Sequence, residues 1–207
     1  MKFLFVLLMI NLSFGITNAQ DIKLPEPSKT GGMPLMEALN RRQSVREMSG
    51  QEIPLNTLSD LLWAAQGVNR EDGKRTAPSA MNMQEIDVYV YTTGAVYRYI
   101  PGEHLLKHIV DGDYREETVL QPYAQKAPLV MVYVANYEKM QRLDQEQKVF
   151  YGAADAAFIS QNVYLFCAQE NLNTVVLGMI DRNAIKERIG FNGKAQLGQV
   201  IGYPIPR

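Results

Sequence analysis

One long segment, from Val149 to Gln169, constrains the fold most, because apolar and small side chains occupy nearly every face of the helix it would form. The residues that give it this character are Ala153, Ala154, Ala156, Ala157, Phe158, Ile159, Val163, Leu165 and Ala168. A helix that is apolar all round is buried, either in a core or between subunits. The chain has 207 residues, 46% of them hydrophobic, which is enough for a single folded domain around such a helix.

Alternating apolar and polar residues predict a β-hairpin, with strands over 86–91 and 95–100 joined by a Thr-Thr-Gly turn. The run 129–135 is almost wholly apolar, which is typical of a central strand. Further strands are predicted over 174–180 and 199–203. Because strands and helices follow one another without a regular β-α-β rhythm, we expect an α+β fold with a mixed, mostly antiparallel sheet flanked by helices.

Four shorter helices are predicted from apolar spacing and capping residues. They run from Leu35 to about Arg42, from a cap at Asn56 or Thr57 to Gly67, from His104 to Val110, and from Asp181 or Arg182 to Gly190.

Charge and cysteine content exclude several classes of protein. The formal net charge of −1 argues against nucleic-acid binding driven by bulk charge. The single cysteine, Cys167, excludes an internal disulfide framework and a cysteine-based metal cluster, and on the apolar helix it is predicted to be an inert core residue. His104 and His108 are the only histidines, so we interpret them as a solvated helix face and expect no metal site.

The N-terminus has the layout of a secretory signal: a basic start, an apolar run from Phe3 to Ile10, and the small residue Ala19 before the expected cleavage point. The run is shorter than the roughly 20 residues of a spanning helix, although a retained anchor is the alternative. Residues 1–19 are therefore predicted to be a signal peptide that directs export to the periplasm without stable membrane insertion. Residues 20–34, with three prolines and two glycines, are expected to be an extended lead-in to a domain over 35–207.

A basic segment follows the first predicted helix. Arg42, Ser44 and Arg46 are spaced by two, so an extended chain would point all three side chains the same way. Two guanidiniums and a hydroxyl on one side suit a phosphate. From the spacing alone, a solvated basic stretch is the simpler interpretation.

A second polar segment runs from Arg75 to Gln84, between the second helix and the hairpin. Pro78 stiffens this loop, and Ser79 and Asn82 supply hydrogen-bonding groups. Taken alone, the segment is a common polar turn.

The two segments together resemble the nitroreductase family of FMN flavoproteins. The resemblance continues over about residues 35–204, and the spacing from Tyr97 to Gly178 is most similar to the branch that includes the SagB-type dehydrogenases. Its motifs, in chain order, are Arg-x-Ser-x-Arg, Leu-x-x-Leu-Leu-x-Ala-Ala, Pro-Ser-Ala-x-Asn-x-Gln, Ala127-Pro128, Gln161-Asn162 and Ile201-Gly202-Tyr203-Pro204. Each motif is weak, but their order and spacing together are specific.

The resemblance implies that FMN is the cofactor, and that the flavin, rather than a catalytic side chain, carries the redox chemistry. It implies an FMN site at the interface of a homodimer, with Leu177 and Gly178 beside the reactive N5 of the ring. The residues implied for the phosphate and ribityl chain are Arg42, Gln43, Ser44 and Arg46, and those reaching the flavin of the second subunit are Pro78, Ser79, Ala80, Met81 and Asn82. Gln121 is assigned to the pyrimidine edge, and Arg207 to the place of a basic C-terminal tail that many members have.

Two functions remain open. The first is an FMN-dependent oxidoreductase that passes hydride between a donor, NAD(P)H or another, and a small organic, quinone or nitro-type substrate. The alternative is an exported module of the same fold that binds a small molecule or a partner without redox turnover.

Overall fold

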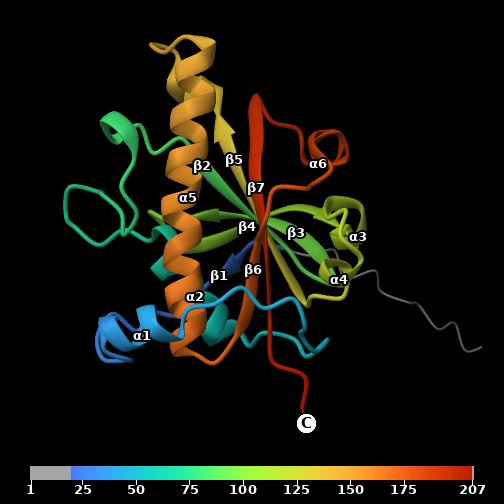
Figure 1. Cartoon of the computed structure of the whole chain (residues 1–207). Helices are drawn as coiled ribbons and strands as arrows, with labels where there is room; N and C mark the ends of the chain where they lie inside the picture. The colour runs from blue at the N-terminus through green and yellow to red at the C-terminus, as the bar shows by residue number, and fades with distance from the viewer. Residues whose placement is uncertain (1–19, 207) are drawn as a thin grey trace, which may run out of the picture.

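The computed structural model describes residues 20–206, and in it a seven-stranded sheet lies between two layers of helices (Figure 1). The strand order is β1-β4-β3-β2-β5-β7-β6, and each pair of neighbouring strands is antiparallel, so the described sheet has no parallel pair. The strands are β1 (Ile22–Lys23), β2 (Ile86–Tyr91), β3 (Ala95–Ile100), β4 (Leu105–Asp111), β5 (Leu129–Asn136), β6 (Asn173–Leu177) and β7 (Gly193–Gly202). The predicted α+β fold is confirmed. The predicted signal peptide, residues 1–19, and Arg207 lie outside the described residues.

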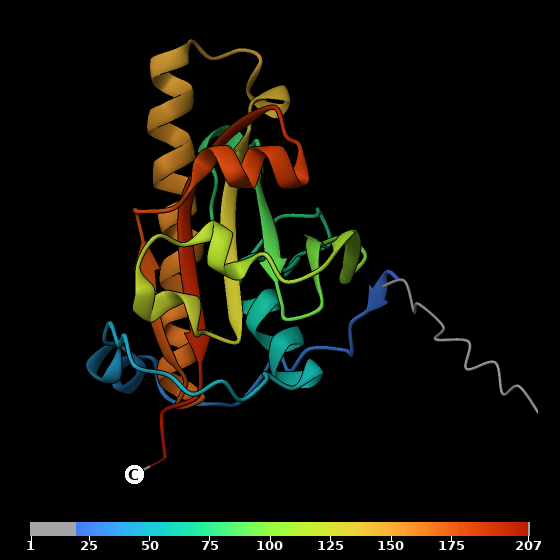
Figure 2. The same ribbon diagram turned by 90° about the vertical axis from the view of Figure 1, so that its right-hand side faces the viewer.

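Two helices cover one face of the sheet and three cover the other (Figures 1 and 2). The long α5 and α2 lie on the first face, and α3, α4 and α6 lie on the second. The helices are α1 (Leu35–Arg41), α2 (Leu55–Gln66), α3 (Arg115–Thr118), α4 (Pro122–Gln125), α5 (Gln145–Gln169) and α6 (Arg182–Ile189), with 3₁₀ turns η1 (Ala80–Asn82) and η2 (Tyr137–Met140). Within the described residues, no helix is both long enough and apolar enough to cross a membrane.

The predicted central strand is confirmed in β5, which lies between β2 and β7. Its side chains alternate between two hydrophobic clusters. Met131 and Tyr133 face the cluster under α2 and α5, while Val130, Val132 and Val134 face the cluster under α3, α4 and α6. Strand β5 therefore joins the two halves of the core.

Helix α5 begins four residues before its predicted start, because Asp144 caps it. The Asp144 carboxylate accepts the Gln147 N–H, and the Gln147 side chain accepts the Asp144 N–H, which is a capping box. The helix is buried on its sheet side, where Cys167 is 1% exposed and burial raises the pKa of its thiol. Phe150 and Phe158 are 65% and 48% exposed, so the helix is not buried on every face within one chain, and the alternative of burial between subunits stays a prediction.

The predicted helix from His104 to Val110 is wrong, because this segment is strand β4, paired with β3. His104 precedes the strand with a φ of 47°, and its ring nitrogens lie 2.6 Å from Ser59 Oγ and 2.8 Å from Tyr99 Oη. His108 Nε2 lies 3.1 Å from Asp111 Oδ1. The two histidines therefore share no helix face.

Three predicted boundaries also move. Strand β6 ends at Leu177 instead of residue 180, and Ile180 makes only an isolated bridge with Val119. Strand β7 begins at Gly193, six residues before its prediction, because its first half pairs with the end of β5. Helix α2 begins at Leu55 after Pro54 instead of after an Asn or Thr cap, while Asp181 caps α6 as expected.

Candidate functional site

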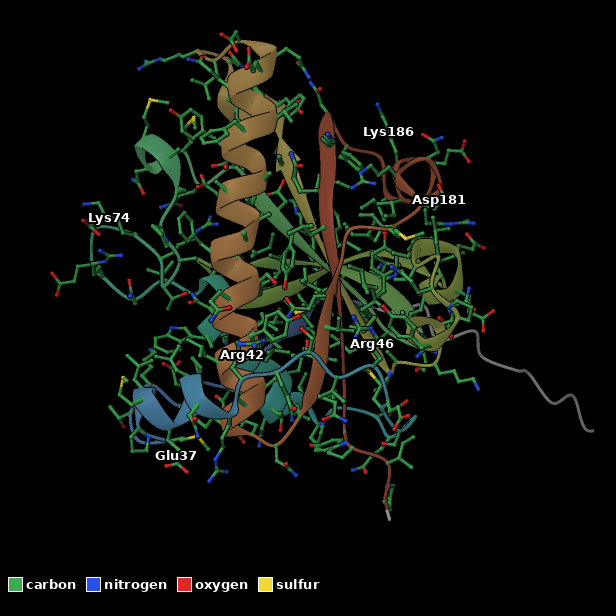
Figure 3. The ribbon with its side chains drawn as sticks, in the orientation of Figure 1. Glu37, Arg42, Arg46, Lys74, Asp181 and Lys186 are labelled. Carbon is green, nitrogen blue, oxygen red and sulfur yellow. The ribbon has the colours of Figure 1, made fainter. Side chains whose placement is uncertain are left out.

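The basic segment after α1, residues 42–49, crosses the ends of β6 and β7 in an extended conformation (Figure 3). Val45 N–H donates to the Thr174 carbonyl at 2.9 Å, and Ser49 N–H donates to the Tyr203 carbonyl at 2.8 Å. These bonds belong to the main chain, so they fix the position of the segment and leave its alternate side chains free. Arg42 and Arg46 occupy two of these alternate positions, and Ser44 lies between them.

Tyr164 on α5 joins the basic segment to the sheet. Its hydroxyl lies 2.8 Å from Ser44 Oγ and accepts the Val176 N–H at 2.9 Å. The Arg42 guanidinium lies 5.2 Å from the centre of the Tyr164 ring, within cation–π distance. The sequence analysis missed Tyr164; the signal was a tyrosine in an apolar helix, since a buried hydroxyl there needs a polar partner.

Two guanidiniums of this segment, those of Arg42 and Arg46, have no carboxylate partner among residues 20–206. Their neighbour Arg41 differs, because it pairs with Glu37. Arg46 extends beyond β6 and β7, 5.9 Å from the centre of the Tyr123 ring (Figure 3). A cavity of about 370 Å³ borders Arg42, in the range of small-molecule sites. An uncompensated guanidinium beside a cavity suits a phosphate, and here that guanidinium belongs to Arg42.

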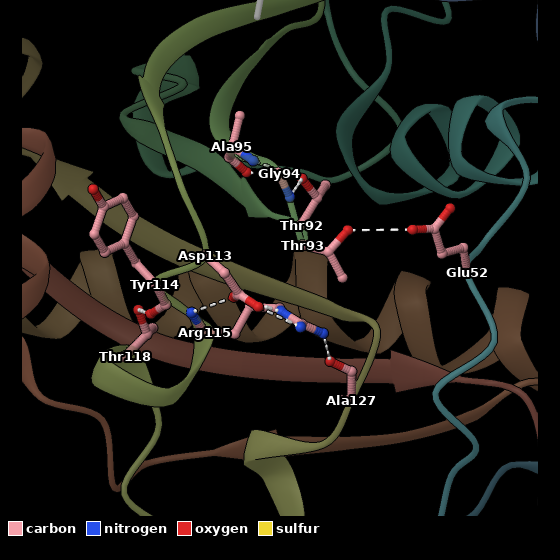
Figure 4. Close-up of polar contacts among 10 residues, drawn as sticks. All are labelled: Glu52, Thr92, Thr93, Gly94, Ala95, Asp113, Tyr114, Arg115, Thr118 and Ala127. Atoms are coloured by element: carbon pink, nitrogen blue, oxygen red, sulfur yellow. Dashed lines mark hydrogen bonds and ion pairs between the residues drawn. The ribbon is translucent and has the colours of Figure 1, made fainter. Parts of the chain in front are cut away.

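A second segment, residues 113–127, passes beside the residues that follow β6 and is braced by Arg115 (Figure 4). The guanidinium makes two hydrogen bonds to Asp113, at 2.8 and 2.6 Å, and also donates to the Ala127 carbonyl. Hydrogen bonding to Arg115 lowers the pKa of Asp113. The brace closes the segment into a loop that carries Gln121 and Tyr123.

This loop brings Gln121 beside the end of β6. The Leu120 N–H donates to the Met179 carbonyl at 3.4 Å, next to Gly178. The Gln121 Oε1 is buried and has no hydrogen-bond partner among the described residues. A Cβ built on Gly178 would meet nothing within 4 Å, so its backbone borders open space. Leu177 is only 2% exposed and belongs to the core, so its side chain cannot line this space.

The loop from Pro78 to Gln84 lies elsewhere on α5. The Ala80 N–H donates to Asp155 Oδ2 at 2.8 Å. Asp155 precedes Tyr164 by nine positions, which is roughly 13–14 Å along the helix. The structure therefore places Arg42, Ser44 and Arg46 along β6 and β7 and places Gln121 near Gly178, but within one chain it does not bring Pro78–Asn82 to the basic segment.

Below this loop two carboxyl groups meet. Glu85 is fully buried and Asp155 is 3% exposed. Burial and a hydrogen bond to Asp155 raise the pKa of Glu85 to about 8. Glu85 therefore keeps its proton at neutral pH, a feature that the sequence analysis missed.

Comparison with known proteins gives one consistent result. Residues 39–203 match the family model described as "Nitroreductase family". A candidate nitroreductase of Methanocaldococcus jannaschii is 32% identical over 198 residues, covering 91% of this chain and 98% of that protein. The crystal structure of a candidate nitroreductase from Ralstonia eutropha JMP134 is similar with a TM-score of 0.88 and 41% identity, covering 92% of each chain. A candidate NAD(P)H:FMN oxidoreductase from Staphylococcus epidermidis has the same fold, with a TM-score of 0.61 and 16% identity over 87% of this chain and 92% of that one.

Proposed function

Because the chain belongs to the nitroreductase family, a family of flavin oxidoreductases, we propose that it binds FMN and passes hydride between a donor and a small organic, quinone or nitro-type substrate. The observation that supports this most is the pair of guanidiniums, Arg42 and Arg46, which have no carboxylate partner in the described chain. An exposed solvated stretch would not need the main-chain bonds and the Tyr164 hydroxyl that hold this segment.

The remaining donors and acceptors fit the rest of FMN. FMN, when bound, accepts and donates hydride at N5 of its ring. Arg42, Ser44 and Arg46 hold the phosphate, with Gln43 adjacent, and the unpaired Gln121 Oε1 accepts a hydrogen bond at the pyrimidine edge. The backbone at Gly178 borders the ring. Leu177 contributes at most its backbone.

We also propose a homodimer. The exposed side of α5 carries Phe150 and Phe158, and a second copy would remove both from water. The Pro78–Asn82 loop, which lies apart from its own Arg42 and Arg46, would then reach the flavin of the second subunit. The exposed side chains of Met81 and Asn82 are available for that contact.

The predicted signal peptide leads to a proposal about the electron donor. A periplasmic enzyme has no regular supply of NAD(P)H, so the donor would be a reduced organic molecule or another partner. Anaerobic titration of the yellow protein with NADH, NADPH and a hydroquinone tests this. We expect the hydroquinone to bleach the flavin absorbance. Bleaching by NADH or NADPH alone would contradict the proposal that the donor is a reduced organic molecule or another partner.

The proposed cofactor is tested by purifying the chain without its first 19 residues and recording its absorbance. We expect flavin bands in the visible blue and one FMN per chain after saturation. A colourless protein that takes up no added FMN would contradict the proposal and favour the module without redox turnover. The branch within the family stays a prediction.

A further inference from the structure

The loop from Pro78 to Gln84 has a backbone shape that its residues do not prefer. Met81, Asn82 and Gln84 have φ values of 51°, 53° and 50°, in the left-handed region that disfavours side chains with a Cβ. Met81 is 68% exposed, so its side chain is not what holds the loop down. The shape must come from contacts with the rest of the molecule.

The loop is held to the rest of the chain at Gln84 and at Ala80. The Gln84 side chain donates to the Gly73 carbonyl at 3.1 Å, and the Gln84 carbonyl accepts from Lys139 at 3.2 Å. Within the loop, the Gln84 N–H donates to Ser79 Oγ at 3.0 Å. Toward α5, the Ala80 N–H donates to Asp155 Oδ2 at 2.8 Å. The cavity between the loop and α5 measures about 10 Å³, which is room for at most about one water molecule. Little solvent therefore lies between the loop and α5.

The carboxyl group of Glu85 is placed to share a proton with Asp155. Both Glu85 side-chain oxygens are buried, and no N–H of the described residues donates to them. The Glu85 side chain is within hydrogen-bonding reach of Asp155. Two buried carboxylates in contact cannot both be charged, so one proton between them keeps the pair together.

Two cations lie near Glu85, and each binds another group, although the Arg75 Nε is buried without a hydrogen-bond partner among the described residues. Lys139, from η2, pairs with Asp87 at 2.7 Å and donates to the Gln84 carbonyl at 3.2 Å. Arg75, from the segment after α2, donates to Gln66 Oε1 at 2.9 Å. Neither makes a hydrogen bond to Glu85.

We propose that Glu85 is a positioning residue: in its protonated form it donates to Asp155, Asp155 holds the Ala80 amide, and loss of the proton releases the Pro78–Gln84 loop from α5. The contacts from Glu85 to Asp155 and from Asp155 to the loop lie within one chain and require no bound flavin. The consequence for flavin binding rests on the function proposed above, because this loop is the part that would reach the flavin of the second subunit.

Hydrogen exchange measures directly how well the loop amides are protected from solvent, and it needs no flavin. The Ala80 amide is followed by mass spectrometry on the peptide covering residues 79–84, in the wild type and in Glu85→Gln. The measurements are made at about pH 6.5 and about pH 9.5, roughly 1.5 pH units on either side of the Glu85 pKa. Comparing the two proteins at the same pH cancels the intrinsic rate of exchange.

A glutamine at position 85 donates to Asp155 but carries no proton to lose. We therefore expect equal protection of the Ala80 amide at the lower pH, and protection at least about tenfold lower in the wild type than in Glu85→Gln at the higher pH. Equal protection in both proteins at both pH values would overturn the proposal.

Three further variants keep the test decisive. Glu146→Gln removes an exposed carboxylate from α5 and should leave the pH dependence of the wild type intact. Asp155→Asn still accepts the Ala80 N–H and can donate to an ionised Glu85, so it should abolish the alkaline loss even if Glu85→Gln fails to fold. Glu85→Ala lacks the donor and should show low protection at both pH values. A purely structural role for Glu85 would give no pH-dependent difference among them.

Flavin occupancy provides the second measurement. Wild type loaded with FMN and dialysed at the higher pH should lose more flavin than Glu85→Gln. If the exchange result holds but no flavin binds at either pH, the proposed function fails while the role of Glu85 stands. If flavin binds and the exchange shows no difference, the role of Glu85 fails alone.

Discussion

The basic segment after α1 and the Pro78–Gln84 loop both contact α5, yet they are held by different chemistry. The first is fixed by main-chain bonds from Val45 and Ser49 to the sheet and by the neutral hydroxyl of Tyr164. The second is held to α5 by the hydrogen bond from the Ala80 amide to Asp155, which lies beside the buried carboxyl group of Glu85. The contacts named for the first region involve no carboxyl group, whereas the proposal above makes those of the second region depend on pH.

The largest effect is expected from Arg42→Ala, which removes a guanidinium from the rigid region. A hydrogen bond to a charged group contributes about 1.5–3 kcal/mol, so the affinity for FMN should fall by roughly 10- to 150-fold. Titration of apoprotein with FMN measures it. Arg41→Ala is the matched control, because Arg41 is an exposed residue paired with Glu37, and its loss should change the FMN affinity by less than about twofold.

Tyr164→Phe should weaken the same region, because it removes the hydroxyl that joins this segment to β6. The Val176 N–H loses its acceptor and Ser44 loses a partner, which should lower the free energy of unfolding by about 1–2 kcal/mol and also weaken FMN binding. Urea unfolding measures the first effect. Tyr151→Phe, on the same helix and without a hydroxyl contact in the described structure, is the control and should change stability by less than about 0.5 kcal/mol. Equal losses in both variants would mean that the Tyr164 hydroxyl has no special role.

The ionisation of Glu85 should also change the free energy of unfolding of the whole protein with pH. Because the pKa of Glu85 is raised from 4.5 to about 8, its contribution to stability is complete below pH 4.5 and is lost as the pH rises to 8. The slope is at most about 1.4 kcal/mol per pH unit. Glu85→Gln should lack this slope, so the difference between the two unfolding free energies should change steadily over this interval. A constant difference would show that Glu85 ionises in the folded protein as it does in water.

The smallest effect concerns the strained turn. Met81→Gly should stabilise the protein by up to about 0.5–1 kcal/mol, because glycine accepts the φ of 51° and the exposed side chain loses little packing. Met36→Gly is the opposite control, since Met36 is exposed within helix α1 and glycine there costs about 1 kcal/mol. The same sign for both changes would contradict the strain at Met81.

Much of the fold could be predicted because local patterns and tertiary packing agree. The hairpin of β2 and β3, the apolar β5 and the capped α6 follow their sequence signals closely. The segment Leu105–Val110 fails because its apolar residues suit either a short helix or a strand, and pairing with β3 decides. The first half of β7 fails because its glycines and polar residues have low strand propensity, and β5 supplies the pairing.

The candidate site was predictable in part for the same reason. Arg42, Ser44 and Arg46 stand out by spacing, and family motifs identify Gly178. The partners of Tyr164 and Glu85 could not be predicted, because each is distant in sequence: Ser44 for the first and Asp155 for the second. Both contacts involve residues of α5, and only the folded chain shows which distant segment packs against each of those residues.

The central claim is that guanidiniums after α1 hold the phosphate of a flavin nucleotide, and the most direct test compares FMN with riboflavin, which lacks that phosphate. Dissociation constants for both ligands are measured for the wild type and for Arg42→Ala. We expect the wild type to prefer FMN by at least about tenfold and Arg42→Ala to lose most of that preference. Equal affinity of the wild type for both ligands, or a preference that survives in Arg42→Ala, would contradict the account.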